Sequence, residues 1–270
     1  MKLMILSAAL VCAAGFPVVM TAQELRTEAS VLSPEDVTKH ARKMLDELMP
    51  VMIDYLRDVK DKESADRVAL RFIVDKSMIM GLGEYIDCMG MRPKEDVSPE
   101  MMELIKETQK IESELYRDKF HGSILMACAW DEAYGMTFPE VTEEEKAAAG
   151  KMLDEQDARK TGDILATVKD LGTADAAGRA LLEKRAMHSL LAEAGYVPRE
   201  RRYFLLSDEE RAQLEGLNRA NCYGSLLLVM VSEFLEYAHN KACREEKEED
   251  TLLPPELPQE VIVLPVEPCS

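Results

Sequence analysis

The sequence is poor in basic residues. It contains 33 Lys and Arg against 51 Asp and Glu, which gives a formal net charge of −18 at neutral pH. A surface this acidic repels phosphate backbones and anionic lipid. The composition therefore argues against nucleic-acid binding, and it favours solubility and an unknown protein or other cationic partner.

The sequence also lacks the short motifs that carry familiar chemistry. It has no phosphate-binding glycine loop, no CxxCH for haem attachment, no HExxH and no GxSxG. No segment shows sustained strand alternation bounded by hairpin turns, so we expect an all-α fold. Nothing here calls for a cofactor, and we expect a non-enzymatic protein. A hydrolase on a helical scaffold is a lower-ranked hypothesis.

Long apolar runs are absent beyond the N-terminus. A lysine at position 2 precedes apolar residues 3–20 and the small residue Ala22, a pattern typical of a secretory signal peptide. We predict removal of residues 1–22, an extracytoplasmic location (periplasmic or secreted) and no transmembrane anchor in the mature chain, whose charge becomes 32 − 51 = −19. A retained anchor is the alternative, because about 18 apolar residues is near the minimum for a membrane span.

Cysteines are few, and their number is odd once the predicted signal peptide is removed. In an oxidising compartment pairs of thiols tend to form disulfides, but an odd number leaves at least one thiol over. We favour a bridge between Cys243 and Cys269. Buried free thiols are the alternative interpretation for the others, which are Cys88, Cys128 and Cys222.

The two halves of the chain resemble each other. Residues 54–105 align without a gap with residues 163–214, and 13 of these 52 positions are identical. Within them VKDKESAD at 59–66 returns as VKDLGTAD at 168–175. We interpret the similarity as an internal duplication.

The alignment offset changes once. It is 163 − 54 = 109 at first and 222 − 120 = 102 where FHGSIL at 120–125 meets CYGSLL at 222–227, so the second copy lacks 109 − 102 = 7 residues inside a helix. Small residues in these two stretches are interpreted as places where helices pack closely.

Each copy is predicted to contain three helices. The first carries Pro50, where a kink or break is expected, and ends at the VKD corner. Ser64 and Thr173 are expected to cap the second helix, with Asp66 and Asp175 at its second position. The third helix is expected to run without interruption, from Ser98 to about Tyr134 and from Ser207 to about Cys243.

The predicted architecture is therefore all-α, with two tandem three-helix units and a C-terminal tail. A charged run and five prolines favour an extended tail in which only Val261–Leu264 resembles a strand. The predicted boundaries are 33–137 for unit 1, 141–244 for unit 2 and 245–270 for the tail.

The repeated corner resembles one found in uncharacterised secreted helical proteins of Gram-negative bacteria. These proteins carry a VxDxxSAD sequence between two helices, which matches residues 59–66 in full. The resemblance implies a helical fold and no activity, since no catalytic motif comes with it.

Two sets of residues are candidate metal ligands. Thioether and thiol groups suit soft metals such as copper, and the first set is Met78, Met80, Cys88, Met89 and Met91. The second set falls on one helical face at i, i+3 and i+7, namely Glu236, His239 and Cys243. Methionine as flexible core filler and solvated charged side chains are the alternatives. We expect a binding or structural module of the cell envelope or exterior, with an exported soft-metal binder as the rival hypothesis.

Overall fold

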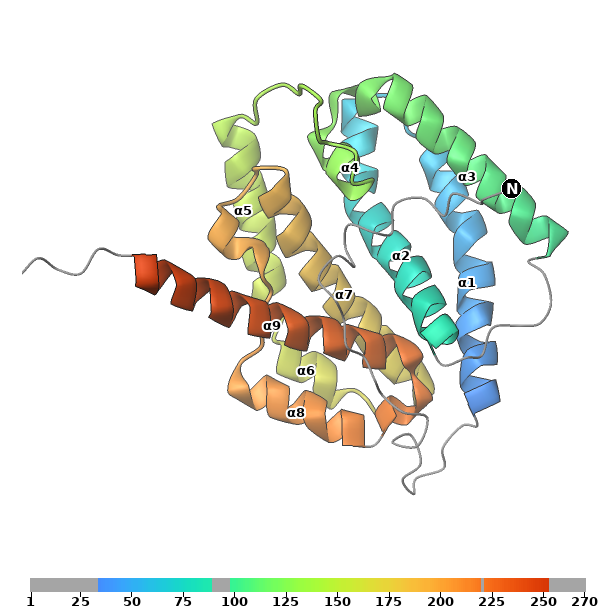
Figure 1. The fold of residues 1–270 in the computed structure, drawn as a ribbon, viewed down its shortest axis with the longest axis vertical. Helices are drawn as coiled ribbons and strands as arrows, with labels where there is room; N and C mark the ends of the chain where they lie inside the picture. Colours follow the sequence, from blue (N-terminus) through green and yellow to red (C-terminus); the bar gives the residue numbers. More distant parts are fainter. Residues whose placement is uncertain (1–33, 89–97, 220, 253–270) are drawn as a thin grey trace, which may run out of the picture.

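A computed structural model describes residues 34–88, 98–219 and 221–252, and in these ranges the chain forms nine α-helices and no strand (Figure 1). The predicted all-α fold is confirmed. The helices are α1 (Pro34–Arg57), α2 (Lys62–Cys88), α3 (Pro99–Arg117), α4 (Ile124–Ala129), α5 (Glu143–Asp157), α6 (Thr161–Ala166), α7 (Leu171–Glu193), α8 (Asp208–Arg219) and α9 (Leu226–Leu252). Three short 3-10 helices, Lys119–Gly122, Arg199–Arg202 and Asn221–Gly224, join some of them.

Local sequence signals explain several helix ends. Ser98 caps α3 by accepting the Met101 N–H at 3.1 Å, with Pro99 at the first helical position. Thr142 and Glu145 form a reciprocal capping box at the start of α5. In contrast, Pro50 does not break α1, which runs through it to Arg57.

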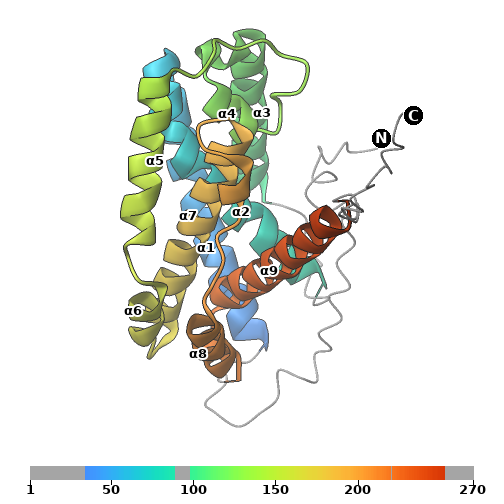
Figure 2. The ribbon, with the colours of Figure 1, turned by 90° about the vertical axis from the view of Figure 1, so that its left-hand side faces the viewer.

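Helices α2 and α7 form the centre of the molecule. They pack against each other, and in Figure 2 they lie between α5 on one side and α9 on the other. Glycine permits a close approach of α7 and α9: a Cβ on Gly178 of α7 would lie 3.0 Å from the backbone nitrogen of Leu228 in α9. A larger side chain there would push the two helices apart.

Among the described residues, two hydrophobic clusters make up the core, and each draws on both halves of the chain. The first cluster includes Phe72 of α2 and Phe120, together with Leu190 of α7. The second includes Leu181 of α7 and Leu227 of α9, together with buried residues from the first half, namely Ala41, Leu48, Val74, Met78, Leu82 and Ile86. The two predicted units therefore share their cores.

The third helix of each unit is interrupted, contrary to the prediction of one continuous helix. The interruptions lie between α3 and α4 and between α8 and α9, where the backbone turns through a left-handed conformation. Helix α3 has 19 residues and α8 has 12. The difference of 19 − 12 = 7 equals the change in alignment offset.

Several sequence predictions concern segments outside the described residues. These are the signal peptide at 1–22, the last part of the tail at 253–270 with Cys269, and the ligands Met89 and Met91. Part of the predicted tail is described, and it is helical: α9 continues to Leu252, through the charged run at 245–250. Glutamate and lysine are strong helix formers, which explains this continuation. Among the described helices, none is long and apolar enough to cross a membrane.

Candidate functional site

The repeated corner is a capping box, and it is the same in both copies. The backbone N–H of Ser64 donates to Asp61 Oδ1 at 2.8 Å, while the Asp61 N–H donates to Ser64 Oγ at 3.1 Å. In the second copy the Thr173 N–H donates to Asp170 Oδ1 at 2.8 Å, and the Asp170 N–H donates to Thr173 Oγ1 at 3.0 Å. The hydroxyl and backbone N–H of Ser64 hold the pKa of Asp61 below its ordinary value.

The predicted capping residues were therefore wrong by one helical turn. Asp61 and Asp170 cap α2 and α7, while Ser64 and Thr173 occupy the third helical position and complete the box. Asp66 and Asp175 consequently lie at the fifth position, not the second. The sequence offers two good capping residues three apart, and their backbone geometry decides between them.

The two aspartates instead receive hydrogen bonds from distant serines. Ser123 Oγ donates to Asp66 Oδ1 at 2.5 Å, and Ser225 Oγ donates to Asp175 Oδ1 at 2.6 Å. Each serine Oγ also accepts the backbone N–H three residues further on, at 2.9 and 3.0 Å, and so caps α4 or α9. Both serines are completely buried. One hydroxyl thus starts a helix and fixes it to the central helix of the same unit.

The second oxygen of each aspartate has a different partner in each copy. Lys62 Nζ lies 2.9 Å from Asp66 Oδ2 and 2.8 Å from a Glu145 oxygen, which links α2 to α5. His40 Nε2 lies 2.6 Å from Asp175 Oδ2, which links α1 to α7. The hydrogen bond from Lys62 lowers the pKa of Glu145 to about 2. These contacts connect the two predicted units to each other.

A left-handed turn precedes each of the two serines. The φ angles of residues 119–122 are 50°, 52°, 52° and 81°, and those of residues 222–224 are 47°, 53° and 83°. Both turns end in glycine, which adopts positive φ readily. A Cβ on Gly122 would meet nothing within 4 Å, so the prediction that this small residue allows close helix packing was wrong. Gly122 instead allows the positive φ with which the turn ends.

A completely buried carboxylate lies where α1, α2 and α7 meet. Asp75 Oδ1 accepts a hydrogen bond from Arg179 Nη2 at 2.7 Å, and Asp75 Oδ2 accepts one from the Tyr55 hydroxyl at 3.0 Å. Arg71 Nε lies 3.7 Å from the same Oδ2. The buried negative charge therefore has two cationic partners and one neutral donor, as a charge in a protein interior requires.

The side chains around this carboxylate are held in place by contacts with one another. The Arg71 guanidinium lies over the Tyr55 ring, 4.3 Å from its centroid. Burial, followed by the nearby Asp75 charge, raises the pKa of Tyr55 well above its ordinary value, so its hydroxyl keeps its proton and donates. Both arginines reach the surface, with side chains 51% and 47% exposed.

The aligned position in the second unit is Lys184 (75 + 109), a charge of the opposite sign. Lys184 is 2% exposed, and its Nζ lies 5.0 Å from the centroid of the Phe204 ring. Burial lowers the pKa of this lysine. The two copies therefore share their capping boxes and differ in the buried charged residue of the central helix.

Another buried polar side chain, His188, joins α7 to α5. Its Nε2 lies 2.8 Å from Asp157 Oδ1, and its Nδ1 lies 2.7 Å from the backbone oxygen of Arg201. The Arg201 guanidinium in turn contacts Asp157 and Asp154 at 3.1 and 2.8 Å. Both ring nitrogens thus face acceptors within the protein, which assigns His188 a structural role.

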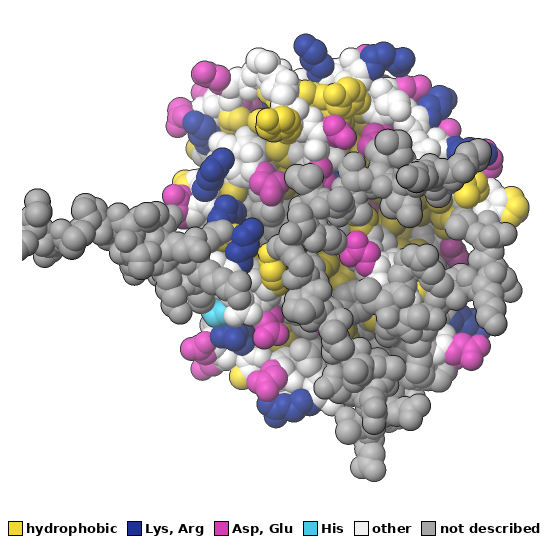
Figure 3. All heavy atoms as spheres, in the orientation of Figure 1, with side chains coloured by type: hydrophobic (Ala, Val, Ile, Leu, Met, Phe, Trp, Pro, Cys, Tyr) yellow, Lys and Arg dark blue, Asp and Glu magenta, His cyan; other side chains and the backbone are white. Residues whose placement is uncertain are grey.

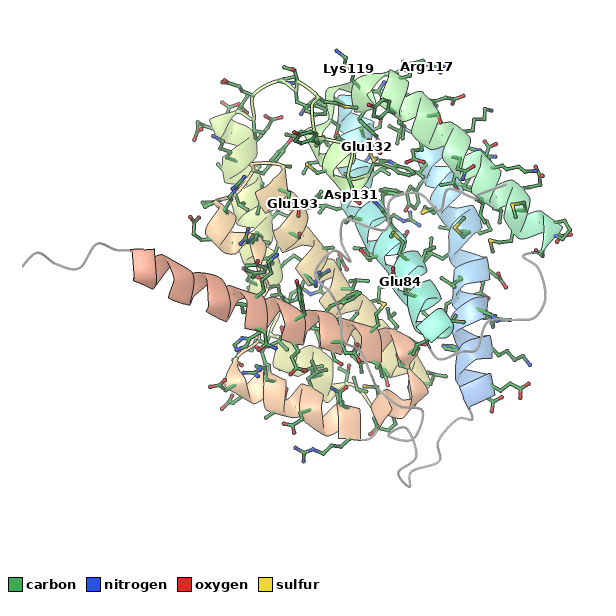
Figure 4. All side chains as sticks on the ribbon, viewed as in Figure 1. Glu84, Arg117, Lys119, Asp131, Glu132 and Glu193 are labelled. Carbon is green, nitrogen blue, oxygen red and sulfur yellow. The ribbon has the colours of Figure 1, made fainter. Side chains whose placement is uncertain are left out.

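An acidic group of side chains lies near the ends of α4 and α7 (Figure 4). Asp131 forms an ion pair with Lys76 at 2.6 Å. Burial, followed by the charge of Glu132, raises the pKa of Glu112, and burial raises that of Glu193. The ion pair with Lys76 offsets part of the negative charge of this group. Across the face in Figure 3 both signs of charge are scattered among hydrophobic side chains.

Two of the five predicted soft-metal ligands, Met78 and Met80, have side chains that the structure describes. Met78 is 2% exposed and belongs to the second hydrophobic cluster, and Met80 is partly buried. Cys88 ends α2, but its side chain lies outside the described residues, as do Met89 and Met91. Met78 therefore packs as a methionine of the hydrophobic core.

The second candidate set lies on α9. Glu236 is exposed, and His239 Nε2 lies 3.3 Å from Arg211 Nη1, a cationic neighbour that disfavours a metal ion there. Cys243 belongs to α9, and its side chain is not described. Over the described ranges, no three His, Cys, Asp or Glu side chains are placed to hold one metal ion.

Two of the cysteines, Cys128 and Cys222, are buried and form no disulfide. Burial raises the pKa of each to about 12. Cys222 Sγ also lies 3.0 Å from Asn218 Oδ1. A buried thiol of this kind is neutral at physiological pH and is a poor nucleophile.

No protein-family profile, curated protein or solved structure matches this chain.

Sequence reasoning missed the group around Asp75. A signal was present, because Asp75 stands in the stretch RFIVDKSMIM, where an acid interrupts residues that are otherwise mostly apolar on a buried helix. The hydrogen bond between the Tyr55 hydroxyl and Asp75 was not foreseen either. Arg179 is 104 residues away from Asp75, and no local pattern links the two.

Proposed function

We propose that the protein is a non-enzymatic, exported helical binding or structural module of the cell envelope or exterior. The observation that carries the proposal is the group around Asp75. One buried carboxylate joins three helices, and its two arginine partners present guanidinium groups at the surface. Such a group suits a rigid scaffold that recognises a ligand at its surface.

The engagement of reactive side chains supports the non-enzymatic part of the proposal. The buried hydroxyls of Ser123 and Ser225 donate to Asp66 and Asp175 while they cap helices. A serine whose hydroxyl hydrogen points at a carboxylate, with no histidine between them, is not arranged as an activated nucleophile. The export part rests on residues 1–22 alone.

The duplication belongs to the same proposal. Its support is the repeated capping box, the repeated Asp–Ser hydrogen bond and the repeated left-handed turn, all at aligned positions. The different partners of Asp66 and Asp175, and the exchange of Asp75 for Lys184, indicate that the copies diverged where they meet other helices.

Serine variants test the non-enzymatic proposal. Ser123→Ala and Ser225→Ala are each expected to lower the free energy of unfolding by about 1.5 to 3 kcal/mol, because each removes a hydrogen bond to a charged group. Ser232→Ala is the matched control: this buried serine bonds to Asn218 and to a backbone oxygen, both uncharged, so a smaller loss is expected. Urea denaturation followed by circular dichroism measures all three.

The same preparations test the rival hypotheses. The purified chain should contain no stoichiometric metal by elemental analysis and should hydrolyse no ester or amide in a broad substrate panel. A hydrolytic activity that Ser123→Ala or Ser225→Ala abolishes without loss of stability would overturn the proposal. One bound copper or zinc ion per chain would favour the soft-metal hypothesis instead.

A further inference from the structure

The positive charge around Asp75 exceeds what the carboxylate needs. Arg71 and Arg179 contribute two positive charges against one negative charge. The chain has 51 acidic residues for 33 basic ones, so carboxylates are abundant. Two arginines that share a single buried acid are therefore unexpected in this composition, and they leave a local excess of one positive charge.

The two guanidinium groups also have unused donors. An arginine has five N–H donors. Arg179 uses Nη2 on Asp75, and Arg71 directs Nε toward the same carboxylate. Within the described part of the chain, neither guanidinium makes any other hydrogen bond or ion pair. Because both contact the oxygens of one carboxylate, they lie close enough together for a single anion to contact both.

The two arginines are held in fixed positions. Arg71 is stacked on the Tyr55 ring, and Arg179 is held by the short hydrogen bond to a buried oxygen. Fixing the donors before the ligand arrives reduces the entropy that binding must overcome. A freely moving surface arginine lacks this advantage.

The surroundings indicate what else the ligand contacts. Val51 lies one helical turn before Tyr55 on α1 and is 44% exposed, which adds an apolar edge. On α2, Arg67 lies one turn before Arg71 and is exposed. On α7, Glu183 lies one turn after Arg179 and is also exposed. Helical spacing therefore places one further positive charge beside Arg71 and one negative charge beside Arg179.

We propose that Arg71 and Arg179 form a binding site for an oxyanion group, a carboxylate or phosphate carried by a ligand. The planar, forked guanidinium group matches the paired oxygens of both anions. This site would be the ligand-binding site of the proposed binding module, so the inference rests on that proposed function. The excess of acid over the whole surface favours cationic partners, whereas this one position is suited to an anion.

A titration by nuclear magnetic resonance tests the site. The side-chain Nε–Hε resonances of the arginines are followed while succinate, and separately inorganic phosphate, is added to the full chain at 150 mM sodium chloride, on the order of physiological ionic strength, so that distant acidic charges are screened. We expect the Arg71 and Arg179 signals to shift along one saturating curve with a Kd on the order of 1 mM. Saturation by succinate alone identifies a carboxylate site, and saturation by phosphate alone identifies a phosphate site.

Variants separate specific binding from general salt effects. Arg71→Ala should fold, because Asp75 keeps Arg179 and Tyr55, and it should weaken binding at least tenfold. Arg71→Lys keeps the charge without the fork and should weaken binding less. Arg57→Ala is the matched control, since Arg57 is an exposed arginine that contacts Asp54 and Glu107, and it should bind like the wild type.

Two results would overturn the site. One is the absence of saturation by either anion up to tens of millimolar, on the order of the weakest affinities that are specific. The other is equal binding by Arg71→Ala and the wild type. Neither result bears on the metal and hydrolysis measurements, so failure of this site and failure of the proposed function are distinguishable.

Discussion

Arg179 on α7 and Asp75 on α2 are joined by a 2.7 Å hydrogen bond between side chains that differ greatly in exposure. Asp75 is completely buried, whereas the Arg179 side chain is 47% exposed. Removing the acid leaves two arginines that water can solvate. Removing the arginine leaves a charge that water cannot reach.

Substitutions of Arg179 and of Asp75 should therefore differ in their effect on stability. Arg179→Met is expected to lower the free energy of unfolding by about 3 to 5 kcal/mol, the cost of leaving a buried charge without its main partner. Asp75→Asn keeps an acceptor for Arg179 and Tyr55 and should cost about 1 to 2 kcal/mol. Urea midpoints at pH 7 give both values. A larger loss for Asp75→Asn than for Arg179→Met would show that the buried Asp75 charge does not need Arg179 to compensate it.

The capping boxes should contribute in both copies. Ser64→Ala and Thr173→Ala are each expected to cost about 0.5 to 2 kcal/mol, because each removes the acceptor for the N–H of the capping aspartate. Ser64 should show the larger loss, since it is buried and Thr173 is only partly buried. Ser113→Ala, at an exposed mid-helix position, is the control and should change stability by less than about 0.5 kcal/mol. Unchanged midpoints for both corner variants would contradict this account.

Glu233 on α9 should make stability depend on pH. Burial, followed by the charge of Glu236, raises the pKa of Glu233 from 4.5 to about 7. Between these values the folded chain holds a proton that the unfolded chain has lost, so the free energy of unfolding falls as pH rises and levels off above pH 7.

Glu233→Gln removes this dependence, because glutamine has no proton to lose. Relative to the wild type, the variant should gain stability between pH 5 and pH 8, measured as urea midpoints at the two pH values. Glu236→Gln removes the second cause of the shift and should reduce the pH dependence only in part. An equal difference between Glu233→Gln and the wild type at both pH values would rule out a raised pKa.

The two buried thiols should react only when the chain unfolds. Because burial raises the pKa of Cys128 and Cys222 to about 12, few thiolates are present at pH 8. Alkylation with iodoacetamide, read by peptide mass spectrometry, should leave both cysteines unmodified in buffer and modify both in urea. Rapid modification of either one in the folded chain would contradict the burial described above.

Local patterns in the sequence predicted the local features of the fold. Apolar spacing indicated helices throughout, and the repeated VKD phrase marked the start of both central helices. The similarity of FHGSIL and CYGSLL marked two equivalent segments, but both were expected to lie inside a continuous helix. Their left-handed turns were not predicted, because Phe120 and Tyr223 are residues that rarely adopt positive φ. The burial of the following serines explains why the chain accepts these conformations.

Contacts between residues far apart in the sequence could not be predicted from such local patterns. The partners of Asp66 and Asp75 lie 57 and 104 residues further along the chain. Helical periodicity assigns a residue to a face, but it does not say which helix covers that face. The candidate oxyanion site therefore became visible only once α2 and α7 were placed side by side.

The shared cores affect the order in which the chain can acquire its structure. A ribosome releases the N-terminal half first. Leu48, Val74 and Met78 of that half belong to a cluster that is completed by Leu181 and Leu227. Until α7 and α9 have been synthesised, the apolar faces of α1 and α2 lack their partners, so the nascent first half cannot complete its core. A fragment that ends before α7 would expose these apolar faces to solvent.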